Sequence, residues 1–320
     1  MSMRFSIALA TCNGARFLPE LLESLATQQL PPFEIVACDD ASDDGTVAIL
    51  ESFAVRALFP VRIHRNPTRL GVVENFSRAI AACNGNYIAL ADQDDVWHTN
   101  KLARLSEALA VSAVVAAFSD ANVVAENLDG LGYTIWKRVC FKKSEQQRTT
   151  QGYAFEVLLK HQVVTGATLA FKATLRQGAL PIPSGWPHDA WLALIAAAEG
   201  RLVAVNEALI DYRQHENNVV GGRRQTHWRE AWTALSLDRS IWYRDEIRCW
   251  RALAERLATL HVSPSAKLTL TEKITHLETR ASLPNARWRR LPSVWREITA
   301  GRYTRHARNW GSIAIDLLVK

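Results

Sequence analysis

Three carboxylates stand within four residues of the chain, in the segment Asp92-Gln93-Asp94-Asp95. They directly follow the apolar run 87–90, so they lie where a buried strand is expected to end. Carboxylates this close repel one another and lose hydration there, which favours a positive charge among them. A hard divalent cation, Mg²⁺ or Mn²⁺, takes oxygen ligands and is commonly shared with substrate phosphates. The segment predicts a metal and phosphate site, and a solvated acidic turn is the competing interpretation.

The common glycine-rich phosphate-binding motifs are absent from the sequence. Neither G-x-G-x-x-G nor G-x-x-x-x-G-K-[ST] occurs. The charge of a bound diphosphate would therefore have to be held by a metal and by scattered donors. This requirement again points to Asp94 and its neighbours.

Short apolar runs alternate with helical patterns over the first 110 residues. Strands are expected at 4–10, 34–38, 61–64 and 87–90, and a helix with one apolar face follows each of them. This alternation predicts an α/β domain with a mostly parallel, open sheet and helices on both faces.

Polar residues follow these strands at the points where the strands end. They are Thr11 and Asn13, Asp39 and Asp40, Asn66, and the acidic cluster Asp92 to Asp95. In open parallel sheets, ligands bind at the carboxyl ends of the strands. The shared edge is therefore the expected site.

The second half of the chain has a looser pattern. Strands are expected at 163–171, around Gly166, and at 202–205 and 209–212, with a buried helix at 190–198. Helical periodicity dominates beyond residue 222. We therefore predict a catalytic domain of residues 1–222 and a basic, Trp-rich helical region of residues 223–320.

Charge is unevenly distributed between these two regions. The chain has 38 Lys and Arg against 32 Asp and Glu, but residues 221–320 alone have 19 against nine, with seven of the 11 Trp residues. A solvated helical surface explains this composition. A second explanation is peripheral contact with an anionic membrane through Arg287 to Arg290, Arg302, Arg305, Arg308 and Trp310, beside the apolar run 313–319. No nucleic-acid reader motif accompanies the charge, so nucleic acid is not an expected partner.

The sequence also indicates the cellular compartment. No apolar run approaches the roughly 18 to 20 residues of a membrane span, and the N-terminus lacks the pattern of a signal peptide. Five cysteines without a C-x-x-C pair are expected to be reduced core thiols. These features favour a cytoplasmic protein, which could lie on the inner face of the cell membrane.

Several short segments together resemble one known family. They are Thr11-Cys-Asn-Gly14, Asp39-Asp-Ala-Ser-Asp-Asp-Gly-Thr46, Asn66 with Gly71 and Asn75-Phe76, and Asp92-Gln-Asp-Asp-Val-Trp97 with Lys101. In this order they resemble the family 2 glycosyltransferases, which have the Rossmann-like GT-A fold. Three further segments are most similar to bacterial rhamnosyltransferases of surface polysaccharide synthesis: Thr165-Gly-Ala-Thr-Leu-Ala-Phe171, His188-Asp189-x-Trp191 and Tyr212-Arg-Gln-His215-x-Asn-Asn218. The resemblance covers residues 4 to about 222.

The resemblance implies a nucleotide-sugar site at the sheet edge. The implied binding residues are Thr11, Asn13, Asp39, Asp40, Asn75, Asp92 and Gln93. Asp39 or Asp40 would accept a hydrogen bond from the pyrimidine N3–H, which uracil and thymine share. Asp92 would face ribose or metal.

The resemblance also implies the reacting groups. Asp94 would ligate Mn²⁺ or Mg²⁺, His215 is a candidate additional ligand, and Asp189 would be the general base. A structural role is the alternative for His215, and an N-cap of the following helix is the alternative for Asp189. Trp191 could pack that helix or line the acceptor site.

The implied reaction is inverting, metal-dependent glycosyl transfer. The donor would be a dTDP- or UDP-sugar, with dTDP-L-rhamnose the best single choice, and the acceptor a saccharide or a lipid-linked saccharide. A sugar nucleotidyltransferase is one alternative, although Thr11-Cys-Asn-Gly-Ala-Arg16 is a poor version of its glycine-rich loop. A non-catalytic sugar-binding or scaffold protein of a polysaccharide assembly complex is another.

Overall fold

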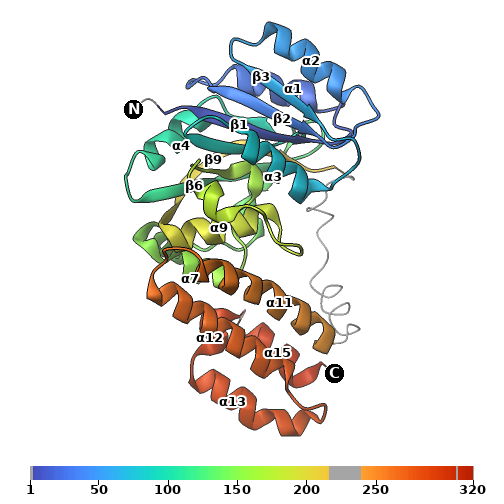
Figure 1. The fold of residues 1–320 in the computed structure, drawn as a ribbon. Coiled ribbons are helices and arrows are strands. Elements are labelled where there is room, and N and C mark those ends of the chain that lie inside the picture. Colours follow the sequence, from blue (N-terminus) through green and yellow to red (C-terminus); the bar gives the residue numbers. More distant parts are fainter. Residues whose placement is uncertain (1–2, 216–238, 308, 320) are drawn as a thin grey trace. The chain divides into compact units, whose positions relative to one another are not determined.

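The computed structural model describes residues 3–215, 239–307 and 309–319 (Figure 1). Contacts within the chain divide it into two compact units. The first consists of Met1–Ala154 and Val163–His215, and the second of Phe155–Gln162 and Glu216–Lys320. The boundary predicted near residue 222 lies outside the described residues, so the division at 222 remains a prediction.

The first unit alternates strands and helices up to α4 and becomes less regular beyond it. Its elements are β1 (Phe5–Thr11), α1 (Leu18–Ala26), β2 (Glu34–Asp39), α2 (Thr46–Arg56), β3 (Val61–Arg65), α3 (Val72–Ala82), β4 (Tyr87–Asp92), β5 (Val96–Trp97), α4 (Lys101–Leu109), β6 (Val114–Val124), β7 (Gly130–Thr134), α5 (Ile135–Arg138), α6 (Lys143–Arg148), the π-helix η1 (Thr149–Tyr153), the 3₁₀ helix η2 (Gly166–Thr168), β8 (Leu169–Lys172), α8 (Leu175–Ala179), α9 (His188–Glu199) and β9 (Arg201–Arg213). Helix α7 (Ala154–Lys160) runs from this unit into the second.

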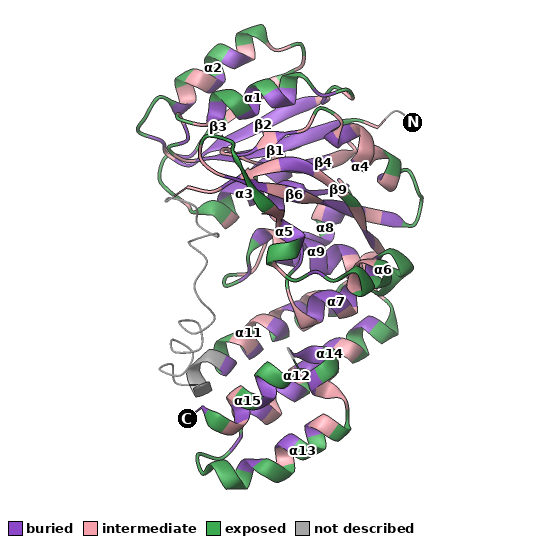
Figure 2. Cartoon of the chain, turned by 180° about the vertical axis from the view of Figure 1, so that it is seen from behind, coloured by how far each residue is buried: buried purple, intermediate pink, exposed green. Residues whose placement is uncertain are grey.

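The described strands form one nine-stranded sheet in the order β3-β2-β1-β4-β8-β6-β9-β5, with β7 paired to β6. Strands β1 to β4 are parallel to one another, whereas β8 is antiparallel to both β4 and β6. Every residue of β1 and β2 is buried. Figures 1 and 2 show why: α1 and α2 cover one side of this part of the sheet, and α3 covers the other, while α9 packs farther along the sheet against β6 and β9. The predicted α/β class is confirmed. The sheet is mixed because β8 pairs antiparallel with both of its neighbours.

Two of the expected strands differ from those observed. The segment expected as a strand over 163–171 begins as a loop and the short helix η2, and only Leu169–Lys172 joins the sheet. The two strands expected at 202–205 and 209–212 are one strand, β9, of 13 residues. Its pairing with β6 shifts between Val205 and Ala208, because a bulge lies where the sequence suggested a turn.

The five cysteines are free, as predicted. Cys38 and Cys83 are buried, but Cys140 is exposed, so the expected core position is wrong for it. Cys140 lies at the short turn after α5, where its φ of 58° leaves the helical region. Within the described segments, no helix has both the length and the apolar character needed to cross a membrane.

The second unit is helical in its described part. Its elements are α11 (Arg239–Ala258), α12 (Pro264–Ala281), the 3₁₀ helix η3 (Arg287–Arg290), α13 (Leu291–Thr299), α14 (Arg302–His306) and α15 (Trp310–Leu318). The helical C-terminal region that the sequence predicted is thus confirmed.

A buried carboxylate joins four segments of the second unit. Asp316 on α15 has no exposed surface and accepts hydrogen bonds from Tyr243 of α11 (2.9 Å) and Tyr303 of α14 (2.6 Å). The Nε of Arg280, at the end of α12, donates to the same carboxylate at 2.6 Å. Arg280 is 4% exposed, so both charges are removed from water and depend on each other.

We expect Asp316→Asn to destabilise the second unit by about 3 to 5 kcal/mol, because the neutral amide leaves the Arg280 guanidinium buried without a countercharge. Urea unfolding of the full chain, followed by tryptophan fluorescence, measures the change. Asp245→Asn is the matched control, since Asp245 forms an exposed pair with Arg248. Equal stability of the two variants would contradict the structural role of Asp316.

Candidate active site

The register of the parallel strands brings the predicted polar residues to one edge. Thr11 at the end of β1 lies opposite Asp39 at the end of β2, and Asp92 at the end of β4 lies opposite Ala10. Asp39 in turn lies opposite Arg65, directly before Asn66. The carboxyl ends of β1 to β4 therefore present these side chains side by side.

Asp39 ties the end of β1 to the loop after β2. It is fully buried, and its Oδ1 accepts a hydrogen bond from the hydroxyl of Thr11 at 3.0 Å. The backbone N–H of Ser42 donates to Oδ2 at 2.9 Å, and its hydroxyl donates to Oδ1. These contacts give Thr11 and Asp39 a role in shaping the loop, and their predicted contact with a nucleotide remains a prediction.

Asp40 is held by donors from the loop that precedes α3. Its Oδ1 accepts from Asn66 (3.0 Å) and from the backbone N–H of Leu70 (2.7 Å), and Oδ2 accepts from that of Gly71 (2.8 Å). Burial acts to raise the pKa of Asp40, but these donors outweigh it and the pKa is lowered. Asp40 is therefore a stable negative charge at the edge.

Asn75 on α3 completes this hydrogen-bond network. Its side-chain Nδ2 donates to the backbone oxygens of Cys38 (2.8 Å) and Thr11 (3.3 Å), and its Oδ1 accepts from Asn66 at 2.9 Å. The amide thus fixes the ends of β1 and β2 relative to α3.

Asn13 joins the loop after β1 to the loop after β2, and Gln93 joins it to the turn after β4. The Oδ1 of Asn13 accepts from the backbone N–H of Asp43 at 3.0 Å. The Gln93 amide accepts from the backbone N–H of Cys12 (2.8 Å) and donates to its carbonyl (2.9 Å). A Cβ at Gly14 would lie 2.1 Å from the Gln93 Oε1, so this two-sided contact requires glycine there.

The acidic turn, in which Asp95 is buried and Asp92 and Asp94 are half-buried, lies beside a buried lysine. Burial and the charges of Asp94 and Asp189 raise the pKa of Asp92 to about 7, and Lys101 acts against this rise. Burial, Asp94 and Asp92 also raise the pKa of Asp95 well above its usual value. The fully buried Lys101 donates to the carbonyl of Ala167 at 2.6 Å. The turn is thus a cluster of interacting carboxylates beside one buried lysine, and burial lowers the pKa of this lysine while Asp95 and Asp92 oppose the effect.

The end of β9 brings His215 to Asp94. The Nε2 of His215 lies 2.8 Å from Asp94 Oδ2, and its ring lies 4.9 Å from that of Phe17. Arg213, two residues earlier, is 1% exposed and donates its Nε to the backbone oxygen of Asp94 at 2.9 Å. Its backbone N–H donates to Asp95 at 3.2 Å, so β9 binds both residues of the turn.

This pair of side chains has the spacing that two metal ligands need. An octahedral Mg²⁺ lies about 2.1 Å from its ligands, which places neighbouring ligands about 3 Å apart. The Asp94 and His215 atoms are 2.8 Å apart and are of types that accept Mn²⁺. Among the described residues no group of three or more His, Cys, Asp or Glu closes on one point, so substrate phosphates would have to complete the coordination.

Asp189 lies in the first turn of α9, whose N-cap is Pro187. Asp189 is therefore not the N-cap. Among the described residues, its carboxylate accepts a hydrogen bond from the adjacent Ala190 N–H, at 2.7 Å. The carboxylate is half-buried and close enough to Asp92 to raise its pKa. Trp191 packs the helix, since it is fully buried and its indole donates to the carbonyl of Ala179 at 2.7 Å.

His188 holds the start of α9 in place. Its ring stacks on Phe76 of α3 with centroids 4.1 Å apart. A Cβ on Gly166 would meet its Nε2 at 2.6 Å and the Asp189 Cβ at 3.6 Å, so η2 approaches this helix end closely. Burial lowers the pKa of His188, and Asp189 opposes this effect. A neutral imidazole thus packs beside the Asp189 carboxylate.

No role was predicted for Arg213 or His188, and Lys101 was named only as part of a motif. Each lies inside or next to an apolar run, where a polar group must find a partner in the fold. That position was the available signal. It could not identify the partners, which come from distant segments.

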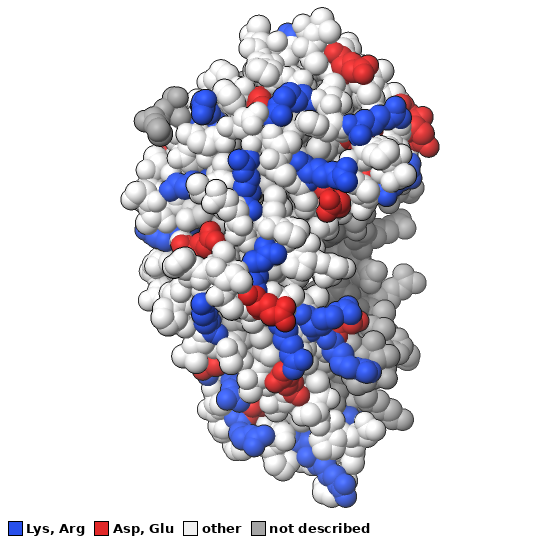
Figure 3. Space-filling view, in the orientation of Figure 1, with Lys and Arg blue, Asp and Glu red and all other residues white. Residues whose placement is uncertain are grey.

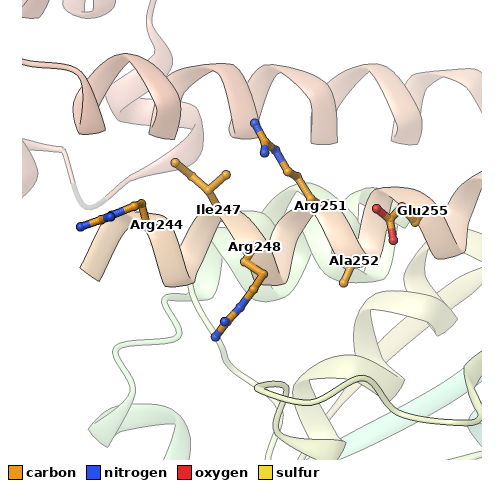
Figure 4. Close-up of a pocket in the computed structure, with 6 residues that line it drawn as sticks. All are labelled: Arg244, Ile247, Arg248, Arg251, Ala252 and Glu255. Atoms are coloured by element: carbon orange, nitrogen blue, oxygen red, sulfur yellow. The ribbon is translucent and has the colours of Figure 1, made fainter. Parts of the chain in front are cut away.

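A pocket of about 400 Å³ lies along α11 in the second unit (Figure 4). Its lining residues are Arg244, Ile247, Arg248, Arg251, Ala252 and Glu255. Arg248 pairs with Asp245 and Arg251 with Glu278. A single lining carboxylate offers neither a metal site nor an acid–base pair, so the sheet edge remains the candidate active site.

The chain is similar to known glycosyltransferases. Residues 6–158 match the profile of glycosyl transferase family 2. The chain is 27% identical to the dTDP-rhamnosyl transferase RfbG of Shigella flexneri over 247 residues, which are 75% of this chain and 82% of that protein.

Solved structures share the fold at low sequence identity. S. aureus TarS in complex with UDP-GlcNAc has a TM-score of 0.58 and 16% identity, over 93% of this chain and 81% of that chain. The mannosyltransferase PcManGT from Pyrobaculum calidifontis, in complex with GDP-Man and Mn²⁺, has a TM-score of 0.57 and 18% identity, over 93% and 76%. The predicted GT-A fold is confirmed, and residues 6–158 of the chain match the model of glycosyl transferase family 2.

Proposed function

We propose that the protein is a metal-dependent, inverting glycosyltransferase whose active site is the carboxyl edge of β1 to β4. The observation that carries the proposal is the contact between Asp94 and His215, which lies beside Asp92. Burial and the charges of both Asp94 and Asp189 raise the pKa of Asp92, so these carboxylates lie near one another. A metal-binding pair and a separate carboxylate therefore act within one small region. Metal-dependent, inverting glycosyl transfer uses a metal site and a separate carboxylate base.

In the proposed site Asp94 and His215 hold Mn²⁺ or Mg²⁺, and Thr11, Asn13, Asp39 or Asp40, Asn75 and Gln93 shape the nucleotide-sugar pocket. The metal supplies positive charge to the diphosphate as negative charge develops on it. Asp40, whose pKa is lowered, remains ionised and can accept a hydrogen bond from a pyrimidine N3–H. Buried contacts at Gln93 and Asn75 keep the loops in one arrangement.

Asp189 acts as the general base in the proposed reaction. Its carboxylate takes the proton of the acceptor hydroxyl while that oxygen bonds to the anomeric carbon. The bond from this carbon to the diphosphate oxygen breaks in the same displacement, and the nucleoside diphosphate leaves with the electron pair. Attack on the face opposite the leaving group inverts the anomeric configuration. The stacked His188 and the close approach of Gly166 fix the helix end that carries this carboxylate.

The proposed donor is a dTDP- or UDP-sugar, with dTDP-L-rhamnose the best single choice. The similarity to a dTDP-rhamnosyl transferase supports that choice. Two structural neighbours are complexes with nucleotide sugars, one with UDP-GlcNAc and the other with GDP-Man and Mn²⁺. The proposed acceptor is a saccharide or a lipid-linked saccharide of bacterial polysaccharide synthesis. The proposed location is cytoplasmic, at the inner face of the cell membrane.

We expect Asp94→Asn to weaken Mn²⁺-dependent binding of a nucleoside diphosphate by at least about 10-fold, because the amide loses the ligand charge. Isothermal titration of dTDP and UDP, with and without Mn²⁺, measures this change. Asp129→Asn, on an exposed loop, is the control and should bind as the wild type does. Unchanged Mn²⁺ dependence in Asp94→Asn would contradict the metal assignment.

Asp189→Asn should lower the rate of transfer by about 10²- to 10⁴-fold while donor affinity stays within about 3-fold, because the amide keeps the shape but cannot take a proton. Transfer to a lipid-linked saccharide and donor binding are measured on the same preparation. Loss of donor binding would assign Asp189 to the donor site and remove it as the base.

A thermal-shift series of nucleotide sugars with Mn²⁺ tests the donor. We expect dTDP-L-rhamnose to raise the melting temperature more than UDP-glucose, UDP-GlcNAc or GDP-mannose at equal concentration, since stabilisation follows affinity. A larger shift with one of the other sugars would replace rhamnose but keep glycosyl transfer.

A further inference from the structure

The second unit exposes three large apolar side chains along one side of a helical segment. Trp288 in η3 is 69% exposed, and Leu291 and Trp295 on α13 are 56% and 68% exposed. Their spacing of three and four residues puts them on one helix face. We call these three residues the Trp288 face. Single exposed apolar residues are ordinary, but a contiguous group marks an interaction surface.

The core of the second unit does not need this face. Val294 and Ile298 of the same helix pack with Leu283, Tyr303 and Ile313 in a buried cluster. Figure 2 shows α13 with both buried and exposed positions. The helix therefore has an apolar inner side that the fold uses, and a second apolar side that the described residues leave in solvent.

The exposed charge around the Trp288 face is positive. Arg287, Arg289 and Arg296 are exposed, and none has an acidic partner among the described residues. From residue 279 to 319 the sequence has two acidic residues, Glu297 and Asp316, which are 1% and 0% exposed. Both are held by buried or half-buried basic groups. Figure 3 shows basic side chains at the end of this unit where α13 lies.

We infer that the Trp288 face binds an anionic membrane surface. Its Trp and Leu side chains would enter the boundary between headgroups and acyl chains, where aromatic rings are favoured. Arg287, Arg289 and Arg296 would meet lipid phosphates while their aliphatic stems cover apolar surface.

A bilayer fits this surface better than a folded protein does. The face is a ridge about 10 Å long on one helix, whereas a stable protein interface needs about 800 Å² on each partner with a polar rim of both signs. A lipid surface accepts a short apolar ridge and supplies only negative charge. Charge complementarity therefore selects anionic lipid as the occupant.

The face is narrower than the membrane contact expected from the sequence. Arg305 pairs with Glu272 at 2.9 Å and Arg302 with Glu297 at 2.6 Å. Ile313 is 6% exposed and belongs to the buried cluster. These residues serve the fold, and Arg308 lies outside the described residues. The inference rests on the proposed function only in that a lipid-linked acceptor would give membrane binding its use.

Cosedimentation of the full chain with vesicles tests the inference without donor or metal. We expect binding to vesicles of phosphatidylcholine with phosphatidylglycerol at 50 mM salt, much weaker binding at 500 mM salt, and little binding to pure phosphatidylcholine. Failure to bind the anionic vesicles at low salt would overturn the inference. Donor binding measured separately by thermal shift shows whether the proposed function stands regardless.

Two variants locate the contact. Trp288→Ala with Trp295→Ala should lower the vesicle partition constant at least about 10-fold, because the interfacial anchors are lost. Replacing Arg287, Arg289 and Arg296 by Gln should lower it on the order of 100-fold, at about 5-fold for each charge. The control is Lys267→Gln with Leu268→Ala, an exposed basic and apolar pair on α12, which should change it less than about 3-fold.

These side chains are exposed, so the variants should fold, and circular dichroism checks this. Equal partition of all three variants would overturn the assignment of the Trp288 face. Sedimentation velocity without lipid tests the rival occupant: if wild type is a dimer and the Trp variant a monomer, the face binds a second copy of the chain and the membrane inference fails.

Discussion

The acidic turn after β4 packs against two buried basic side chains, Lys101 and Arg213. Lys101 at the start of α4 is fully buried and acts on Asp92 and Asp95, and Arg213 at the end of β9 is 1% exposed and donates to the turn. A buried carboxylate without a countercharge would cost several kcal/mol. Lys101 offsets part of this cost, since its charge acts to lower the pKa of Asp92 and of Asp95. Arg213 ties the turn to β9 through its hydrogen bonds to Asp94 and Asp95.

The negative charge of the turn is only partly compensated, so a further positive charge would stabilise it. The pKa of Asp92 is raised to about 7 by burial and by the charges of Asp94 and Asp189, and Asp95 has one buried oxygen with no hydrogen-bond partner among the described residues. A nearby divalent cation favours the ionised form of each carboxylate. The electrostatics of the turn and the proposed metal role are thus consistent with each other, and the same residues are used by both.

The two units differ in where their uncompensated charges lie. The first unit places its unbalanced charge at the edge of a sheet, where ligands bind in α/β folds. The second unit balances its buried charges internally, as Asp316 does with Arg280, and keeps its unbalanced charge outside, on Arg287, Arg289 and Arg296. In each unit the uncompensated charge marks the surface for which we propose a partner.

The sequence by itself determined the order of strands and helices as far as α4, the shared edge of β1 to β4 and the identity of the acidic turn. Period and turn chemistry are local properties, and parallel strands must end at a common edge. It also placed the helical C-terminal region. The resemblance of its motifs to family 2 glycosyltransferases agreed with the profile match and with the fold.

Only the tertiary structure decided how distant residues combine. The contact of His215 with Asp94 spans 121 positions, and Gly166 approaches His188 from a segment that the sequence had suggested was a strand. The tertiary structure also showed which arginines of the second unit pair with a carboxylate and which lie exposed beside Trp288. The sequence cannot make this distinction, because the arginines differ only in the residues that the fold places next to them. Such pairings depend on strand order, bulges and helix packing, and these are set by the packing of the whole unit and not by any local pattern.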